Sequence, residues 1–584
     1  MTELNFKGKE FVYNHHLAVP FRPLVPDESK GIGPVALDGN LIVHGDNLHA
    51  LKALLPLYAG KVDCIFIDPP YNTGNEGWAY NDNVNAPMIR EWLESNPIGI
   101  EDGLRHDKWC AMMWPRLRLL HELLSESGSI WITLDDHEIH RARQIMDEIF
   151  GVENFIGLLI RRTKAGGGSA ADYFAIEHDY ILAYCKRGDD FPKLFIEHDE
   201  EYLTRYAHED DDGRYFWDTF VRNGTKTTPY TIHAPDGTPL NRSWFKSEDV
   251  FKEDLKKGDI KIFMKQDGEW SVQFKQRLSK GRKMRSVLYG TQYISDKDEI
   301  ERMGLAFDHP PKPVELITTI LEAIQNKSAL VLDSFSGTAT TAHSVLESNK
   351  RDGGNRRFIL VEMEDYADKL TAERVRRVIN GYAFKGTQRT ELLRDKITWT
   401  KLKNADKLTE AVVAIENLHG HEYDAIKKTV KNGELIVTGE KNVEDKTEGL
   451  GGSFTYCTLG DPVELDKILS GETLPSFDGL GSVLFHMATA HAFDPATMRE
   501  DDFYLGTVEG QHLWLIYKPD LDWLKSPEAA LTLKRAKDFA ATDKDARHLV
   551  FAPARYVSQK MLAEQNIPVE FVPLPFALYR IDRS

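Results

Sequence analysis

The stretch CIFIDPPYNTG, residues 64–74, carries the strongest structural signal in the chain. Its first four residues are apolar and end abruptly at Asp68, which is typical of a short buried strand in a parallel sheet. Pro69 and Pro70 cannot donate strand hydrogen bonds, so the chain must leave the sheet at Asp68. Ligands of open α/β sheets bind at this carboxyl edge. Taken alone, however, Asp-Pro-Pro is more often an ordinary strand exit with a solvated aspartate.

The residues around this stretch alternate between strand and helix patterns. Strands are predicted at 41–47, 64–67, 129–135, 179–186, 328–333 and 356–364, and helices at 48–58, 109–129, 138–150 and 314–325. Alternation of this kind predicts right-handed crossovers and a largely parallel, doubly wound α/β sheet.

Length and composition divide the chain further. A chain of 584 residues is too long for one core, and two to four domains are expected. Short aromatic-rich segments and acidic loops interrupt the α/β rhythm between 191 and 303. The rhythm returns over 304–385. Residues 386–584 are acidic and irregular, with strand-like runs near 513–517, 548–553 and 569–581. We therefore expect a core formed by 1–190 and 304–385, an insertion at 191–303 and a small C-terminal α/β domain at 386–584.

The compartment follows from what the sequence lacks. No apolar run approaches the ~20 residues of a membrane helix, and the first residues contain no signal-peptide core. The four cysteines are far apart and form no C-x-x-C pair, which favours a reducing cytoplasm and argues against a structural zinc site.

The formal net charge of −18 disfavours a nucleic-acid partner, but local basic segments contact phosphates regardless of the total. One such segment, 275–285, contains six cations and no acid, and another lies at 161–164. An ordinary solvated face explains these cations equally well. The candidate DNA contacts are Arg161, Arg162, Lys164, Lys280, Arg282, Lys283 and Arg285.

A second informative stretch is VLDSFSGTATTAHSVL, residues 331–346. Asp333 ends a strand, and a turn of small residues opens a helix, which brings backbone N–H groups close to a ligand. The turn is neither a P-loop nor a complete G-x-G-x-x-G motif. Glu362, at the end of the next strand, is placed to bind ribose hydroxyls. A doubly wound sheet without a ligand is the alternative for these two strands.

Together, GDN at 45–47, DPPYNTG at 68–74, KPVELI at 312–317, DSFSGTATTAH at 333–343 and FILVE at 358–362 resemble the amino-group DNA methyltransferases. The similarity is greatest to the modification (Mod) subunits of type III restriction–modification systems and covers about residues 1–385. The DPPY tetrapeptide precedes the glycine turn, as in the permuted beta group of this family. The resemblance implies a Rossmann-like methyltransferase core, a target-recognition insertion and a C-terminal accessory or interaction domain.

The resemblance also implies an activity and its partners. The activity would be methyl transfer from S-adenosyl-L-methionine to adenine N6 in duplex DNA, in the cytoplasm of a bacterium or archaeon. The expected partners are a second copy of the chain and a helicase-nuclease restriction subunit, without a membrane or a metal ion.

The family's functional positions map onto named residues. The catalytic residues would be Asp68, Pro69, Pro70 and Tyr71, and the cofactor-binding residues would be Asp46, Lys312, Asp333, Phe335, Gly337, Thr338 and Glu362. Ala339 departs from the family pattern, which has glycine there. If this position requires a positive φ, alanine costs about 1 kcal/mol and cofactor binding is weakened.

The implied chemistry explains the DPPY motif. An exocyclic base amine is a poor nucleophile because its lone pair is delocalised into the ring. Asp68 and the carbonyl of Pro69 can accept its two hydrogens and so favour the geometry that exposes the lone pair. Tyr71 offers a ring on which a flipped base stacks, worth roughly 1–3 kcal/mol.

Three alternatives remain open from the sequence. Cytosine N4 is the nearest alternative target, and glutamine methylation of a protein is a more distant one. The chain could also be a DNA-reading subunit without catalysis, with Ala339 marking decayed cofactor binding. Cytosine-C5 methylation is disfavoured because no cysteine follows a proline.

Overall fold

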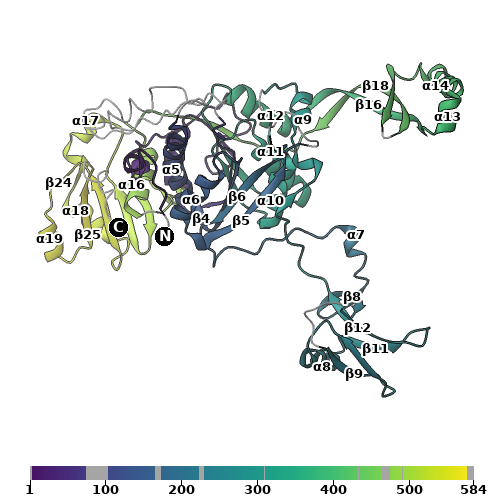
Figure 1. Ribbon diagram of the computed structural model, residues 1–584. Coiled ribbons are helices and arrows are strands. Elements are labelled where there is room, and N and C mark those ends of the chain that lie inside the picture. The colour runs from purple at the N-terminus through teal and green to yellow at the C-terminus, as the bar shows by residue number, and fades with distance from the viewer. Residues whose placement is uncertain are drawn as a thin grey trace. The chain divides into compact units, whose positions relative to one another are not determined.

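A computed structural model describes residues 3–73, 103–164, 173–222, 229–307, 310–431, 433–462, 474–489 and 491–574. The chain forms two compact units (Figure 1). The smaller unit comprises Lys193–Met284 with Glu322–Gln325, and the larger unit comprises the remainder. The smaller unit thus lies within the expected insertion of 191–303 apart from the four residues Glu322–Gln325, whereas residues 285–303 belong to the larger unit.

The larger unit is built on a ten-stranded sheet. Its strands, in spatial order, are β1 (Leu24–Pro26), β19 (Thr455–Leu459), β2 (Leu41–His44), β15 (Arg357–Glu362), β14 (Leu330–Asp333), β3 (Val62–Ile67), β4 (Leu124–Leu134), β6 (His178–Cys185), β5 (Phe155–Arg162) and β13 (Val287–Leu288). In the run β19, β2, β15, β14, β3 and β4, each strand is parallel to the next one. Strand β6 pairs antiparallel with both β4 and β5. The carboxyl ends of β2, β15, β14 and β3 therefore meet at one edge.

Helices cover the sheet because its central strands are apolar on both faces. Ile65 and Ile67 of β3 share one buried cluster with α3 (Asn47–Tyr58), α5 (Arg105–Leu123) and α6 (Ile139–Phe150). Cys64 and Phe66 alternate with them and so face the opposite side. On the chain's return, α11 (Thr340–Asp352) connects β14 to β15. The predicted doubly wound Rossmann-like core is confirmed by this topology.

Three details differ from the sequence prediction. The helix expected at 109–129 begins at Arg105 and ends at Leu123. Strand β5 was not predicted. Strand β19, from the region assigned to the C-terminal domain, is part of the core sheet and pairs with β2.

The smaller unit has its own aromatic core around Phe220, Trp244 and Phe274. Its elements are α7 (Glu200–Leu203), β7 (His208–Asp210), β8 (Gly213–Thr219), β9 (Pro229–His233), β10 (Pro239–Ser243), α8 (Glu248–Lys257), β11 (Ile260–Met264) and β12 (Trp270–Arg277). Strands β11, β12, β8 and β7 form an antiparallel sheet, and β9 pairs with β10.

The described part of the C-terminal region contains two larger sheets besides the short parallel pair of β22 (Ala530–Leu531) and β24 (Ala554–Arg555). The first comprises β16 (Gly381–Lys396), β18 (Glu434–Glu448) and β17 (Ala425–Lys431), with α13 (Trp399–Lys403) and α14 (Ala405–His419). The second comprises β20 (Tyr504–Val508), β21 (Gln511–Leu515), β23 (Arg547–Ala552) and β25 (Val569–Pro573), with α16 (Phe477–Thr489), α18 (Leu533–Ala540) and α19 (Gln559–Glu564).

The remaining elements are short or lie near the site. They are α1 (Lys9–Val12), α2 (His15–Ala18), α9 (Lys297–Arg302), α10 (Val314–Ile324), α12 (Glu373–Asn380), α17 (Leu521–Leu524), β22 (Ala530–Leu531) and β24 (Ala554–Arg555). None of the helices in the described residues is long and apolar enough to cross a membrane.

Candidate active site

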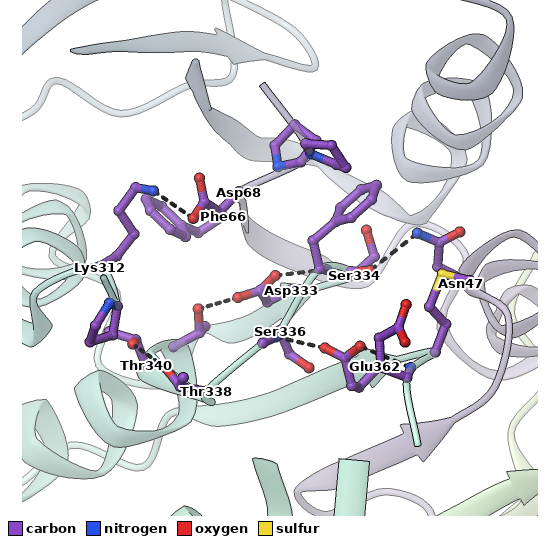
Figure 2. A pocket seen from close by; sticks show the side chains of 18 of the residues that line it. Asn47, Phe66, Asp68, Lys312, Asp333, Ser334, Ser336, Thr338, Thr340 and Glu362 are labelled. Carbon is purple, nitrogen blue, oxygen red and sulfur yellow. Dashed lines mark hydrogen bonds and ion pairs between the residues drawn. The ribbon is translucent and has the colours of Figure 1, made fainter. Parts of the chain in front are cut away.

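A cavity of about 710 Å³ opens at the carboxyl edge of the large sheet. It lies where β3, β14 and β15 end, and the segment before α10 completes it (Figure 2). Every catalytic and cofactor-binding residue predicted from the sequence lines this cavity. They are Asp46, Asp68, Pro69, Pro70, Tyr71, Lys312, Asp333, Phe335, Gly337, Thr338 and Glu362.

Two carboxylates hold the glycine turn in place (Figure 2). The backbone N–H of Phe335 and the hydroxyl of Thr341 donate to Asp333, over 3.0 and 2.5 Å. The backbone N–H of Gly337 donates to Glu362 Oε2 over 2.7 Å. Gly337 has φ 47°, in the left-handed region that glycine adopts at little cost. The turn therefore brings backbone to the cavity wall and fixes both acids beside it.

Ala339 does occupy the left-handed region, with φ 62° and ψ 34°. The strain expected from the sequence is therefore present. Ala339 is fully buried at the start of α11 and is not among the residues that line the cavity. Its methyl group thus packs into the core. Ala339 therefore does not block the cavity, and a blocked cavity gives no reason for the predicted weakening of cofactor binding.

Arg374 of α12 supports the same turn and was not predicted. Its buried guanidinium donates to the carbonyl and hydroxyl of Thr338, both over 3.1 Å, and to the hydroxyl of Thr340 over 2.9 Å. Three bonds from one rigid fork over-determine the turn, which explains how it retains a strained alanine.

Burial makes the two turn acids weak. Desolvation, together with the nearby charges of Asp68 and Glu362, raises the pKa of Asp333 to about 7, against the hydrogen bonds from Thr341 and Phe335. Desolvation also raises the pKa of Glu362 to about 7. Near neutral pH both carboxyls are therefore divided between their charged and neutral forms.

The pKa of Asp46 is lowered, unlike the pKa values of Asp333 and Glu362. It caps α3 by accepting from the backbone N–H of His49 over 3.0 Å, and it lies 3.8 Å from the guanidinium of Arg116. Burial raises its pKa, but the bonds from His49 and the charge of Arg116 outweigh burial and lower it to about 2. Asp46 is thus both a helix cap and a charged cavity residue.

The carboxylate of Asp68 has two partners at the end of β3, of which Figure 2 shows Lys312. Lys312 Nζ donates to Asp68 Oδ2 over 2.5 Å, and the hydroxyl of Thr133 donates to Oδ1. Lys312 was predicted to bind the cofactor, and it does line the cavity, but its ammonium group pairs with Asp68. Thr133, at the end of β4, was not predicted.

The residues after Asp68 are fixed from two sides. Trp109 Nε1 donates to the carbonyl of Pro70 over 2.7 Å. The hydroxyl of Tyr71 donates to Asp179 Oδ2 over 3.3 Å, and Lys312 Nζ lies 5.0 Å from the centre of its ring. Burial, together with the charges of Asp68 and Asp179, raises the pKa of Tyr71 well above its usual value. The ring is thus a neutral, oriented surface at the cavity.

Asp179 is itself held by Arg161, one of the candidate DNA contacts. The Arg161 guanidinium donates to both carboxylate oxygens of Asp179 and to the carbonyls of Tyr293 and Ile294. Arg161 and Asp179 are both buried. The prediction that Arg161 contacts phosphate is therefore wrong, because its side chain points into the core of the larger unit.

The other candidate DNA contacts lie at the surface. Arg162 is half-buried and 3.7 Å from Glu177, and Arg282 is exposed and 3.2 Å from Asp199. The remaining candidates, Lys164, Lys280, Lys283 and Arg285, are exposed. Lys275 and Arg277, counted in the same basic segment, instead form ion pairs with Asp210 and Asp259 of the smaller unit.

Comparison with known proteins is consistent with this geometry. The StyLTI Mod subunit of Salmonella typhimurium LT2, a type III restriction-modification enzyme subunit, is 30% identical over 414 residues, which cover 64% of this chain and 62% of that protein. The EcoPI Mod subunit of Escherichia phage P1 is 29% identical over 485 residues, 69% of this chain and 73% of that protein. The type II methyltransferase M.KpnI of Klebsiella pneumoniae is 29% identical over 58% of this chain and 83% of its own length.

Among solved structures, the cytosine-N4-specific PvuII DNA methyltransferase aligns with a TM-score of 0.30 and 13% identity over 57% of this chain and 86% of its own, too low a score to support the fold assignment. The fold assignment stands on the sheet topology.

The sequence profile of the DNA methylase family, which groups N6 and N4 methyltransferases, matches residues 62–373. That range contains the DPPY residues, the glycine turn and both turn acids. The chain therefore belongs to the DNA methylase family.

Proposed function

We propose that this chain transfers a methyl group from S-adenosyl-L-methionine to adenine N6 in duplex DNA, as the modification component of a restriction–modification or phage-defence system. The observation that carries the proposal is that Asp68 and the two turn acids, Asp333 and Glu362, line one cavity. A methyl donor held by the turn acids would lie next to an amine held by Asp68.

The cavity suits this cofactor chemically. Its acidic wall would hold the cationic donor, and Glu362 is placed to accept from ribose hydroxyls at a strand end. Ser334 lines the cavity, and its buried Oγ has no hydrogen-bond partner among the described residues. Asp46, Phe335 and Thr338 would complete the cofactor site. When bound, S-adenosyl-L-methionine supplies the electrophilic methyl group.

The chain's own residues would orient the target amine. Thr133 and Lys312 fix the Asp68 carboxylate, and Trp109 fixes the loop immediately after Pro69. One amine hydrogen would be donated to Asp68 and the other to the carbonyl of Pro69. The lone pair is then directed at the methyl group, so positioning and electrostatics supply most of the rate enhancement.

Proton removal places a smaller demand on Asp68. The amine nitrogen would become acidic once it had bonded to the methyl carbon, with S-adenosyl-L-homocysteine as the leaving group, and its proton would be lost to water. Asp68 would therefore act mainly by accepting hydrogen bonds. Lys312 would have to yield part of its contact with Asp68 when the amine arrives.

Substitution of Asp68 tests the proposal. Asp68→Ala should reduce methylation of DNA at least tenfold and leave S-adenosyl-L-methionine affinity within a few fold, because the lost contacts are to the amine. Mass spectrometry of digested DNA would identify the product as N6-methyladenine. N4-methylcytosine would replace the adenine assignment with the cytosine alternative. Asp502→Ala, an exposed carboxylate in the C-terminal region, is the matched control. Retention of more than a tenth of the activity by Asp68→Ala would refute the role of Asp68.

We further propose roles for the other parts of the chain, which rest on the similarity to Mod subunits. The smaller unit would recognise the target sequence, with its Lys280, Arg282 and Lys283 contacting phosphates. Arg162, Lys164 and Arg285 of the larger unit would make further phosphate contacts. The C-terminal region would serve assembly into a homodimer and contact with a helicase-nuclease subunit in the cytoplasm of a bacterium or archaeon. Sedimentation of the purified chain, alone and with the product of a neighbouring restriction gene, tests both contacts.

A further inference from the structure

Large apolar side chains are exposed at the edge of the sheet that carries the active site. Tyr173 and Phe174 have 92% and 83% of their surface exposed, and Tyr289 has 69%. Tyr173 and Phe174 are adjacent in the chain, and contiguous exposed apolar surface, unlike single scattered residues, marks binding sites. We call Tyr173, Phe174 and Tyr289 the aromatic rim.

The topology brings the aromatic rim to the same edge of the sheet as Asp68, with β4 and β6 between β3 and β5. Strands β5 and β13 run parallel to β3, and Arg162, the last residue of β5, pairs with His178, the first residue of β6. The backbone N–H of Thr163 donates to the carbonyl of Glu177 over 2.7 Å, which closes the two strands at this edge. Tyr173 and Phe174 precede Glu177 by only a few residues, a span of at most about 14 Å for an extended chain. Tyr289 directly follows β13.

Hydrogen bonds connect the ends of β5 and β6 to Tyr71, on the side of the cavity proposed to hold the target base. The hydroxyl of Tyr71 donates to Asp179, which is held in turn by Arg161, and these two residues lie one position inside His178 and Arg162. The strand ends next to the aromatic rim therefore also orient Tyr71.

Basic side chains at the same edge of the sheet favour the binding of a polyanion such as DNA. Arg162 ends β5, and Lys164, two residues later, is exposed. Two acids lie in the same stretch of sequence: Glu177, which is 3.7 Å from Arg162, and Asp172, which directly precedes Tyr173. Rings flanked by cations are the combination that binds stacked bases and their phosphates.

We infer that the aromatic rim contacts the DNA duplex around the target base, with Tyr173 and Phe174 stacking against the bases that the flipped nucleotide leaves behind. This inference rests on the proposed DNA methylation. Removal of a base from the helix exposes the faces of its neighbours, and an apolar wedge offsets the loss of stacking. The rim would thus stabilise the open duplex, while the chemistry stays at Asp68.

The test begins with wild-type protein and unmethylated plasmid DNA, from which sequencing of modified bases gives the target site. A duplex with 2-aminopurine at the target position then reports base flipping by its fluorescence. Tyr173→Ala/Phe174→Ala should lower kcat/KM for DNA by roughly five- to a hundredfold and reduce the fluorescence rise. S-adenosyl-L-methionine affinity should stay within twofold, because the rings are exposed and are not among the residues that line the cavity.

Two further variants sharpen the result. The exchange Tyr173→Phe/Phe174→Tyr keeps both rings and should retain wild-type kinetics. Tyr556→Ala removes an equally exposed ring from the C-terminal region and should do the same. A mispaired base opposite the target should partly restore the double alanine variant, since less stacking must be broken.

The outcomes separate the inference from the proposed function. If the wild-type chain methylates DNA and the double alanine variant matches it within twofold, the inference is overturned and the proposed function stands. If the double variant instead changes the oligomeric state in sedimentation with unchanged DNA kinetics, the rim is a contact between protein copies and the inference is overturned. If the wild-type chain methylates no DNA, the proposed function and the inference are both refuted.

Discussion

Cofactor binding should be linked to proton release through the two turn acids. Asp333 and Glu362 both have a pKa near 7 in the free chain because they are buried. Hydroxyl and ammonium groups of S-adenosyl-L-methionine need an ionised carboxylate as acceptor, so binding expels whatever proton remains. Because both pKa values are raised, the neutral forms stabilise the free folded chain below pH about 4, and that contribution is lost as the pH rises through about 7.

The size of the effect follows from these values. An acid of pKa about 7 is roughly a tenth ionised at pH 6 and nine tenths ionised at pH 8. If both acids must ionise, affinity should rise about eightyfold between these pH values, and if only one must, about ninefold. Calorimetry in buffers of different ionisation enthalpy measures the protons released, and we expect about one in total near pH 7.

The variants Glu362→Gln and Asp333→Asn isolate each contribution. Each should bind more weakly at pH 8 and should remove its own share of the pH dependence. The cofactor's amino group titrates in the same range but contributes equally to wild type and variants. If wild type and both variants released equal numbers of protons, the acids would already be ionised in the free chain and the electrostatic argument would be wrong.

Three further outcomes are expected. Lys312→Met should lower the methylation rate about ten- to a hundredfold by removing a charge-assisted bond to Asp68, with S-adenosyl-L-methionine affinity nearly unchanged; a single-turnover rate equal to wild type would contradict this. Asp179→Asn should lower the free energy of unfolding of the larger unit in urea by about 3–5 kcal/mol, because it leaves the buried Arg161 guanidinium without its counter-ion. A loss below about 1 kcal/mol would show that the charge of Asp179 is dispensable. Alanine at Arg282, Lys283 and Arg285 should flatten the slope of log DNA affinity against log salt by up to ~3 units; an unchanged slope would assign these cations to a solvated face.

The sequence predicted the cavity well because its residues follow strands. Asp68, Asp333 and Glu362 each end an apolar run, and parallel strands bring such positions to one edge. Local patterns of this kind survive in a single sequence. Such patterns predict at which strand end a side chain lies, and the sheet topology determines which strand ends meet at one edge.

The supporting residues could not be predicted in the same way. Thr133, Trp109 and Arg374 reach the site through long-range contacts that leave no local pattern. Arg161 was misassigned because its charge was counted without its strand register. It lies two residues after buried Leu159 on β5, so strand alternation already placed it on the buried face.

Strand β19 has a consequence for how the chain is made. It seals the edge of β2, yet it is translated about 400 residues later. At about 5–20 residues per second, the N-terminal strands would wait roughly 20–80 s at the ribosome with that edge unpaired. An open edge of buried, apolar strands invites pairing with other nascent chains. A gene fragment ending near residue 385 would leave this exposure permanent, so we expect it to be recovered in inclusion bodies although it encodes every residue that lines the cavity.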